Sequence, residues 1–384
     1  MDTTIKLMSL VGARPQFIKL APLARAINQM NDAVDTPSIQ HIIIHTGQHY
    51  DYGMSDIFFD ELGIPHPDIN LGVGSGRHGE QTGKMLAGIE EALIAHKPDL
   101  LVIFGDTNST VAGALAASKL HIPIAHVEAG LRSFNRTMPE EINRIVADHV
   151  SDILLAPTPT AIEHLKREGL AEKTVSSGDI MYDTVLHNVQ LAEAQSEILR
   201  ALPVEKGAYA IATCHRAENT NDPQRLRHIF ETFNHIAATG TSIILPLHPR
   251  TKNMLPNVLP GWKPDDNLHV IEPVGYLDMM QLVHHARLAL TDSGGLQKEA
   301  FFLNTPCITM RDETEWIETV QAGANIITSA DPDRIMEAYK YWMGQGEVDF
   351  GEEVQAYFGH ADSANLTLKA ILDFLHQKML NPVL

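Results

Sequence analysis

The sequence predicts an α/β protein in which parallel sheets are covered by helices, in two similar domains. Strand and helix patterns alternate from the start, with the apolar run IKLMSLVG followed by the helical FIKLAPLARAINQM. A second alternating series starts near residue 208 with AYAIATCHR and PQRLRHIFETFNHIAA. Units of roughly 25 to 40 residues indicate βαβ crossovers and a doubly wound parallel sheet. At 384 residues the chain is too long for one ordinary core, so two domains with a crevice between them are expected.

The remaining strands have the same character, each a short apolar run bounded by glycine or proline. Such runs suit strands buried on both faces, as in a parallel sheet. In chain order they are HIIIHTG, LLVIFGD, PIAHVEAG, DILLAPT, SIILPLHPR, LHVIEP, LALTDSGG and PCITM. The helical patterns between them include EQTGKMLAGIEEALIAH, STVAGALAASKLH, LDMMQLVHHA and LQKEAFFLN. The domain boundary is expected between about Gly178 and Val204.

The composition is that of an ordinary globular protein, 44% hydrophobic and 20% charged. A formal net charge of −19 argues against non-specific nucleic-acid binding, but it allows an anionic small ligand where basic groups gather. No segment approaches the roughly 18 to 20 apolar residues of a membrane helix, so no membrane insertion is expected. The first apolar run is interpreted as a strand, and two cysteines support no disulfide framework; a cytoplasmic location is expected.

Carboxylates follow two of the predicted strands. Asp106 ends the run LLVIFGD, Glu128 ends PIAHVE, and Glu140 and Glu141 follow shortly after. Ligands of open α/β sheets bind just beyond the carboxyl ends of the strands. These carboxylates are therefore candidates for acid and base chemistry in a shared crevice.

A second motif indicates a diphosphate site. The strand LALTD ends in Ser293-Gly294-Gly295, and a helix carrying Glu299 follows at once. Glycines permit close backbone approach, and amides at a helix start attract anions. Glu299 is placed to accept hydrogen bonds from ribose hydroxyls. Arg14 and Lys19, at the start of the first helix, would add positive charge to a similar turn.

The remaining motifs give weaker indications of function. The stretch Gly72–Lys84 matches neither the dinucleotide fingerprint nor a Walker loop, and it is interpreted as a mobile or positioning loop. His215 and His248 follow strands and are expected to be cleft groups. No histidine pair has the spacing of a helical zinc site and CxxC is absent, so no metal is expected.

Seven motifs occur in order from about residue 6 to 328, and together they resemble the non-hydrolysing UDP-N-acetylglucosamine 2-epimerase family. They are GARPQFIK, TGQHYD, GDTNST, HVEAGLRS, PEEINR, CHRAEN and TDSGGLQKEAF. The resemblance implies the GT-B architecture, two Rossmann-like doubly wound domains flanking a cleft. The first domain would be residues 1–181 with a returning helix in 362–384, and the second, UDP-binding domain 182–361. A UDP-sugar substrate, no cofactor and a homodimer are also implied.

The resemblance also assigns site residues and a reaction. In the family the C2 proton is removed as UDP leaves C1, and UDP then adds back to a bound 2-acetamidoglucal. The matching positions are, for catalysis, Asp106, Glu128, Glu140 and His215; for substrate or UDP, Arg14, Lys19, His248, Ser293, Gly294, Gly295 and Glu299; and for an activating UDP-sugar, Gln48 and His49.

Two departures from the commonest family pattern bear on the sugar. Gln16 stands where many members have Glu, and Trp316 stands where they have Arg. These forms look more like the branch that epimerises UDP-2,3-diacetamido-2,3-dideoxyglucuronic acid, so both residues are candidates for sugar selectivity. The alternatives are a GT-B glycosyltransferase that uses a UDP-sugar donor, a hydrolysing epimerase, and a catalytically idle UDP-sugar sensor.

Overall fold

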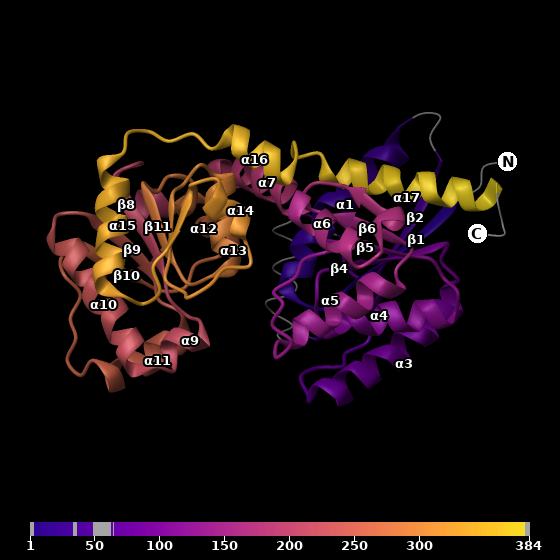
Figure 1. Cartoon of the computed structure of the whole chain (residues 1–384), viewed down its shortest axis with the longest axis horizontal. Coiled ribbons are helices and arrows are strands. Elements are labelled where there is room, and N and C mark those ends of the chain that lie inside the picture. Colours follow the sequence, from indigo (N-terminus) through magenta and orange to yellow (C-terminus); the bar gives the residue numbers. More distant parts are fainter. Residues whose placement is uncertain (1–3, 34–36, 49–62, 64, 381–384) are drawn as a thin grey trace. The chain divides into compact units, whose positions relative to one another are not determined.

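The structure is a computed structural model that describes residues 4–33, 37–48, 63 and 65–380. The chain forms two compact units, each built on its own parallel sheet (Figure 1). Unit 1 comprises Met1–Thr184 and Tyr357–Leu384, and unit 2 comprises Val185–Ala356. The parallel sheets and their covering helices confirm the α/β class predicted from the sequence.

Unit 1 has a seven-stranded parallel sheet with the spatial order β3-β2-β1-β4-β5-β6-β7. The order runs outward in both directions from β1 and β4, which is the doubly wound arrangement. The strands are β1 (Ile5–Val11), β2 (Ile39–His45), β3 (Ile69–Asn70), β4 (Leu100–Phe104), β5 (Ile124–Val127), β6 (Ile153–Ala156) and β7 (Thr174–Ser176). The helices are α1 (Arg14–Asp32), α3 (His78–His96), α4 (Asn108–Lys119), α5 (Pro139–Val150), α6 (Pro159–Arg167), the 3-10 turn η1 (Ala171–Lys173) and α17 (Ser363–Leu380).

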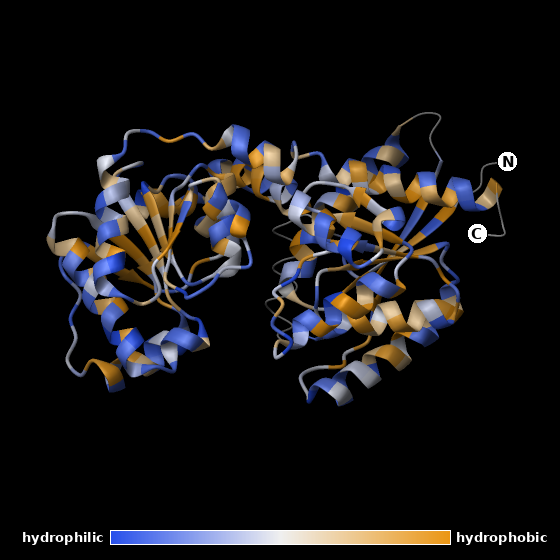
Figure 2. Cartoon of the chain, in the orientation of Figure 1, coloured by the Kyte–Doolittle hydropathy of each residue, from blue (hydrophilic) through white to orange (hydrophobic). Residues whose placement is uncertain are grey.

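Unit 2 repeats the plan with six parallel strands in the order β10-β9-β8-β11-β12-β13. Figure 2 shows the strands of both sheets in orange, because helices bury them on both faces. The strands are β8 (Tyr209–Thr213), β9 (Ser242–Pro246), β10 (Leu268–Ile271), β11 (Leu288–Thr291), β12 (Cys307–Thr309) and β13 (Asn325–Ile327). The helices are α8 (Ile198–Ala201), α9 (Ala217–Thr220), α10 (Pro223–Ala238), α11 (Pro249–Val258), α12 (Tyr276–His284), α13 (Gly294–Phe302), α14 (Ile317–Gln321) and α15 (Pro332–Gly344).

The chain passes between the units twice. Helix α7 (Ile180–Gln195) begins in unit 1 and ends in unit 2, and α16 (Gly351–Phe358) spans the return. The terminal helix α17 then lies beside α1 in unit 1 (Figure 1). Its start is fixed by Asp183, whose carboxylate accepts hydrogen bonds of 3.1 Å from the amides of Ser363 and Ala364.

One expectation about local structure was wrong. The glycine-rich stretch Gly72–Lys84 forms a loop only up to Arg77, because α3 begins at His78, and the helical pattern predicted from Glu80 is confirmed. Gln81, Met85 and Ile89 recur at helical spacing and are buried together. Burial of this face outweighs the low helix propensity of the glycines.

Candidate active site

The two predicted strand-end carboxylates of unit 1 lie at the same edge of the sheet. Phe104 and Val127 are opposite each other in the pairing of β4 with β5; Glu128 follows Val127 directly, and Asp106 follows Phe104 after Gly105. Neighbouring parallel strands in register present the residues after their carboxyl ends side by side. The structure therefore brings these two carboxylates to adjoining loops.

Asp106 is held by an arginine but stays accessible. Arg144 on α5 donates to Asp106 Oδ2 from Nε at 3.0 Å and from Nη2 at 2.6 Å. Asn143 donates to the Asp106 carbonyl at 2.9 Å. The Asp106 side chain is 32% exposed. It is thus oriented by a charged partner while one face remains open to a ligand.

Glu128 sits in a tighter environment. Its side chain forms an ion pair with Lys19 of α1, and both residues are buried. Its backbone has a φ of 68°, a left-handed conformation that side chains rarely adopt and that is often found at functional sites. Gly105 has φ 61°, and a Cβ there would lie 3.3 Å from Lys19 Nζ and 3.5 Å from Glu128 Oε2. Glycine at 105 is therefore needed for both the turn and the ion pair.

Behind these loops lies a buried chain of charges that sequence reasoning missed. His126 on β5 contacts Asp148 through Nδ1 and the Gly105 carbonyl through Nε2, both at 2.7 Å. Asp148 also pairs with Arg132 at 2.7 Å, and Arg132 pairs with Glu168. Hydrogen bonds and opposite charges hold the pKa of Asp148 below its usual value in spite of burial, so it is a carboxylate. Through His126, the turn that carries Gly105 is joined to the buried carboxylate of Asp148.

The two adjacent glutamates at the start of α5 differ sharply. Glu141 is buried and accepts from the Ser133 amide at 2.9 Å, the Phe134 amide at 2.9 Å and Arg144 Nη1 at 2.9 Å. Burial raises the pKa of Glu141, but these hydrogen bonds outweigh it and leave the pKa below its usual value. Glu140 is exposed in the first turn of the helix. Of this pair, Glu140 is the one open to a ligand, as the motif match requires.

Gln16 has a structural position in the first loop. Its Oε1 accepts from the amides of Gly12 at 2.8 Å and Ala13 at 3.1 Å, and its Nε2 donates to the Phe104 carbonyl and Thr110. The side chain is 1% exposed, and its oxygen and its amide group each make two hydrogen bonds. Gln16 therefore shapes the loop that precedes α1.

Other predicted residues of unit 1 are only partly described. Gln48 accepts from Ser109 through both the amide at 3.2 Å and the hydroxyl at 2.8 Å, which anchors it at the start of α4. Arg14 is the first residue of α1, and its side chain lies outside the described part of the structure, as does the whole of His49.

The predicted diphosphate turn of unit 2 is a capped helix start. Ser293 caps α13, accepting from the Leu296 amide at 3.4 Å. Glu299, one turn further on, is buried and accepts from the Tyr276 hydroxyl at 3.1 Å. With Gly294 and Gly295 at the helix start, the backbone amides are unobstructed by side chains of their own, as anion binding requires.

Two arginines lie close to this helix start: Arg216, from the predicted strand-end motif CHRAEN, and Arg311, which sequence reasoning missed. A Cβ on Gly294 would lie 3.4 Å from Arg216 Nη2 and 3.8 Å from Arg311 Nη1. Arg311 is 4% exposed and pairs with Glu315, with Nη1 to Oε2 at 2.9 Å. The Glu315 carboxylate is also present, with Oε2 3.3 Å from the same Cβ position, and it offsets part of this positive charge. The two guanidinium groups beside the helix start are nevertheless the kind of partner that a diphosphate prefers.

The strand-end histidines of unit 2 form a pair. The rings of His215 and His248 lie 5.3 Å apart, and His215 Nδ1 is 3.6 Å from an oxygen of the buried Asp292. Asp292 also accepts from the amides of His215 and Arg216, which fixes the loop after β8. Burial lowers the pKa of His215 below its ordinary value although Asp292 opposes the effect, so the ring is neutral at pH 7.

Trp316 is packed against a lysine. It occupies the N-cap position of α14 and is buried, with Lys298 Nζ 3.8 Å from the centroid of its ring. A cation at this distance over an indole is a favourable cation–π contact. The sequence departure at Trp316 is thus accompanied by a buried lysine on α13, a neighbour that the motif comparison did not single out.

Two Rossmann-like units, one with paired carboxylates and one with a diphosphate-type turn, define a nucleotide-sugar enzyme of GT-B architecture. A family model described as UDP-N-acetylglucosamine 2-epimerase matches residues 32–372, and the chain belongs to that family. The motif resemblance is thereby confirmed, and the activity is that of an epimerase, an isomerase, and not that of a glycosyltransferase.

Two relatives with different activities in their names have nearly the same sequence identity to this chain. The UDP-2,3-diacetamido-2,3-dideoxy-D-glucuronate 2-epimerase of Pseudomonas aeruginosa is 48% identical, covering 91% of this chain and 95% of the relative. The UDP-N-acetylglucosamine 2-epimerase of Methanocaldococcus jannaschii is 47% identical, covering 89% and 93%. A crystal structure of the Methanocaldococcus jannaschii enzyme in complex with UDP-GlcNAc and UDP has a TM-score of 0.82 at 43% identity, covering 96% of this chain and 100% of that one. In the described part of the present chain, no helix has the length and apolar character to cross a membrane.

Proposed function

We propose that this enzyme inverts C2 of a UDP-linked 2-acetamido sugar without hydrolysing it, by elimination and re-addition of UDP. The observation that carries the proposal is the placement of Asp106 and Glu128 on adjoining loops at one sheet edge, each with its own cationic partner. Two carboxylates in different environments suit a proton that leaves one face of a sugar and arrives on the other.

In the forward direction a carboxylate takes the C2 proton. The electrons of the C2–H bond form the C1=C2 double bond of a 2-acetamidoglucal, and UDP departs from C1 with the electrons of the C1–O bond. UDP then adds back to C1, and a second acid delivers a proton to the opposite face of C2. Asp106, Glu128 and Glu140 share these proton transfers, and the neutral ring of His215 steadies the departing UDP.

The nucleotide is held by unit 2 in this proposal. The Ser293 side chain and the amides of Gly294 and Gly295 bind the diphosphate, and Glu299 accepts hydrogen bonds from the ribose. Arg14, Lys19 and His248 complete the phosphate and sugar contacts by family resemblance. Gln48 and His49 belong to a second, activating UDP-sugar site on the same grounds.

The working state follows from the same reasoning. Residues 1–181 with 362–384 form an N-terminal Rossmann-like domain with a returning C-terminal helix, and residues 182–361 form the UDP-binding domain. The enzyme acts in the cytoplasm without a cofactor, a location supported by two buried, unpaired cysteines. It acts as a homodimer by family resemblance. The UDP-N-acetylglucosamine and the UDP-2,3-diacetamido-2,3-dideoxy-D-glucuronate 2-epimerases are almost equally similar to this chain, so the substrate is one of these two UDP-sugars. Trp316 contacts the part of the sugar that differs between the two, and Gln16 acts through its loop.

The test is NMR in D2O with each UDP-sugar offered separately to the full-length enzyme. Deuterium at C2 together with the epimeric product is expected for one sugar, without net release of UDP. Asp106→Asn and Glu128→Gln should slow exchange by on the order of 10²- to 10⁴-fold. Glu163→Gln, an exposed carboxylate of α6, is the matched control and should exchange normally.

Other outcomes identify the rivals. Net UDP release from the sugar nucleotide alone indicates a hydrolysing epimerase, and UDP release that requires an acceptor, without exchange at C2, indicates a glycosyltransferase. Binding of UDP with no exchange from either sugar indicates a sensor. Wild-type rates in both carboxylate variants would show that the catalytic assignment is wrong.

A further inference from the structure

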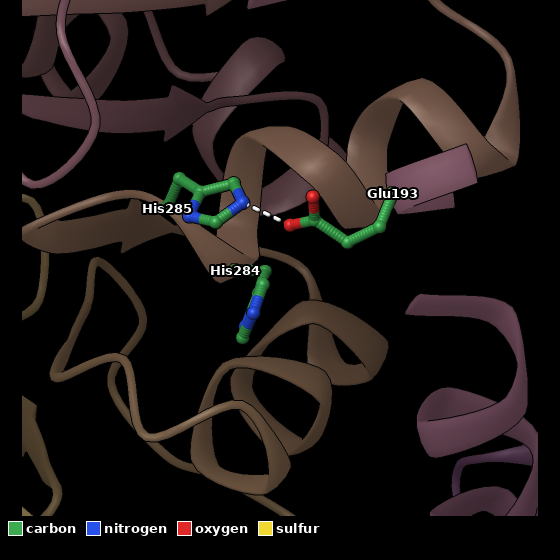
Figure 3. A group of neighbouring side chains, drawn as sticks. All are labelled: Glu193, His284 and His285. Atoms are coloured by element: carbon green, nitrogen blue, oxygen red, sulfur yellow. Dashed lines mark hydrogen bonds and ion pairs between the residues drawn. The ribbon is translucent and has the colours of Figure 1, made fainter. Parts of the chain in front are cut away.

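Three potential metal ligands converge in unit 2, away from the residues discussed above. Glu193 lies near the end of α7, His284 is the last residue of α12, and His285 follows it. One ligand atom from each lies within 4.8 Å of the other two. Figure 3 shows His285 turned toward Glu193, with the ring of His284 seen edge-on below them.

The group contains one ion pair and one imidazole nitrogen without a described partner. His285 Nε2 pairs with Glu193 Oε1. His284 Nδ1 is buried and has no hydrogen-bond partner among the residues that the structure describes. A buried imidazole nitrogen with no partner is costly for the fold, and a metal ion would satisfy its lone pair.

A cation already stands beside these groups. The ammonium of Lys206 lies 2.8 Å from His285 Nε2 and 3.4 Å from Glu193 Oε2. The Lys206 side chain is 55% exposed and the Glu193 side chain 40% exposed, so the position opens to solvent. The local charge therefore favours a positive group, and a flexible lysine can be displaced by an ion that enters from water.

We propose that Glu193, His284 and His285 bind a divalent transition-metal ion, of which Zn²⁺ is the best match. Two imidazoles and one carboxylate are a frequent zinc ligand set, with water completing the tetrahedron. The ion replaces the Lys206 ammonium and takes up the free nitrogen of His284. The site is independent of the epimerase chemistry, which needs no metal in the function proposed above.

The metal would strengthen an existing connection between α7 and α12. Ser196, just beyond α7, already donates to Asp278 of α12 at 2.6 Å. A metal ion bound by Glu193 of α7 and by His284 at the end of α12 would connect the same two helices at a second point. Metal binding should consequently raise the thermal stability of the native protein, because an ion that binds only the folded state stabilises it.

The experiment is a titration of the chelator-treated, full-length protein with Zn²⁺ by calorimetry and with Co²⁺ by visible absorption. One ion per chain is expected, and Co²⁺ should give the intense ligand-field bands of a site with fewer than six ligands. Glu193→Gln, His284→Asn and His285→Asn should each weaken binding by at least about tenfold, the lower end of what even outer-shell changes cause. Glu197→Gln and His235→Asn, which remove like groups from exposed positions elsewhere in unit 2, are the matched controls.

Lys206→Gln is the decisive variant, because it removes the competing ammonium and should tighten Zn²⁺ binding. A gain of affinity cannot result from misfolding. The proposal is overturned if the wild-type protein binds no ion, if the ligand variants bind as tightly as the controls, or if Lys206→Gln weakens binding. Epimerase activity of the metal-free protein is followed in parallel and should be unchanged, so failure of this site leaves the proposed function intact.

Discussion

Asp148 offers the sharpest test of how unit 1 is held together. Its carboxylate bridges two buried side chains, at 2.7 Å from His126 and 2.7 Å from Arg132, and it accepts from the Gly130 amide at 3.2 Å. The side chains of Asp148 and His126 are 0% exposed, so water does not screen the interaction. We compare Asp148→Asn with Asp148→Ala.

The two variants should differ in how much free energy of unfolding they lose. Asparagine keeps one acceptor for Arg132 and a polar group facing His126 Nδ1. The loss is then close to one charge-assisted hydrogen bond, about 1.5–3 kcal/mol. Alanine removes both interactions and leaves the buried Arg132 guanidinium without this partner, which costs roughly 3–5 kcal/mol. Against a typical domain stability of about 5–15 kcal/mol, the alanine variant should be close to unfolding.

Urea unfolding with two probes can locate the loss. All three tryptophans, at 262, 316 and 342, lie in unit 2, so their fluorescence reports that unit, whereas far-UV circular dichroism reports the whole chain. The dichroism midpoint should fall from wild type to Asp148→Asn to Asp148→Ala. Glu163→Ala breaks an exposed pair with Arg167 and should cost less than about 1 kcal/mol.

Catalysis should weaken along with stability. The Asp148 network holds the loop that begins at Glu128, whose backbone is in the left-handed region. Asp148→Asn should therefore lower kcat with little change in KM under conditions where it is folded. An alanine variant with a wild-type urea midpoint, or one no less stable than the asparagine variant, would refute the assignment of a buried charge bridge.

Three further outcomes are expected. Gly105→Ala should lower the free energy of unfolding in urea by about 1–2 kcal/mol, because φ at this position is 61°. The variant should also lose most activity, because the new Cβ lies 3.3 Å from the ammonium of Lys19, which is paired with Glu128. A fully active variant would contradict this prediction. The pKa values of Glu141 and Asp148 are depressed in the folded state, so below about pH 4.5 the unfolded chain binds more protons than the folded chain. The stability that these two carboxylates contribute is therefore complete above that pH and is lost as the pH drops toward the depressed pKa values. Urea midpoints that stay constant from pH 6 to 3 would contradict this prediction. Burial raises the pKa of Cys214, and that of Cys307 to about 12, so a thiol reagent should label neither cysteine at pH 8 until the protein is denatured, as mass spectrometry can measure.

Much of the architecture was predictable because it rests on local patterns. Short apolar runs ending in a carboxylate or in Ser-Gly-Gly indicated the strands, and the strand ends indicated where the polar groups gather. The exception was the start of α3, where glycines suggested a loop over residues that are helical from His78. There, burial of one helix face depends on neighbours that are distant in the sequence.

The details of the site were less accessible. Glu140 and Glu141 are adjacent and identical in type, yet only Glu141 accepts hydrogen bonds from the loop at Ser133 and Phe134. Which of two neighbours points into the protein depends on where α5 lies against that loop. Gln16 resembled a selectivity residue in sequence, and its four hydrogen bonds show that it is also part of the loop framework.

The sequence by itself determined the class of fold, the family and the carboxylates at the ends of β4 and β5, because strand periodicity and motif spacing are local properties. Only the tertiary structure decided which charges pair. The partnership of Lys19 with Glu128 joins residues over a hundred positions apart, and the bridge from His126 through Asp148 to Arg132 has no sequence motif. The cluster of Glu193 with His284 and His285 is of the same kind. Such pairs form where packing brings separate elements together in a low-dielectric interior, and a linear pattern carries no record of that distance.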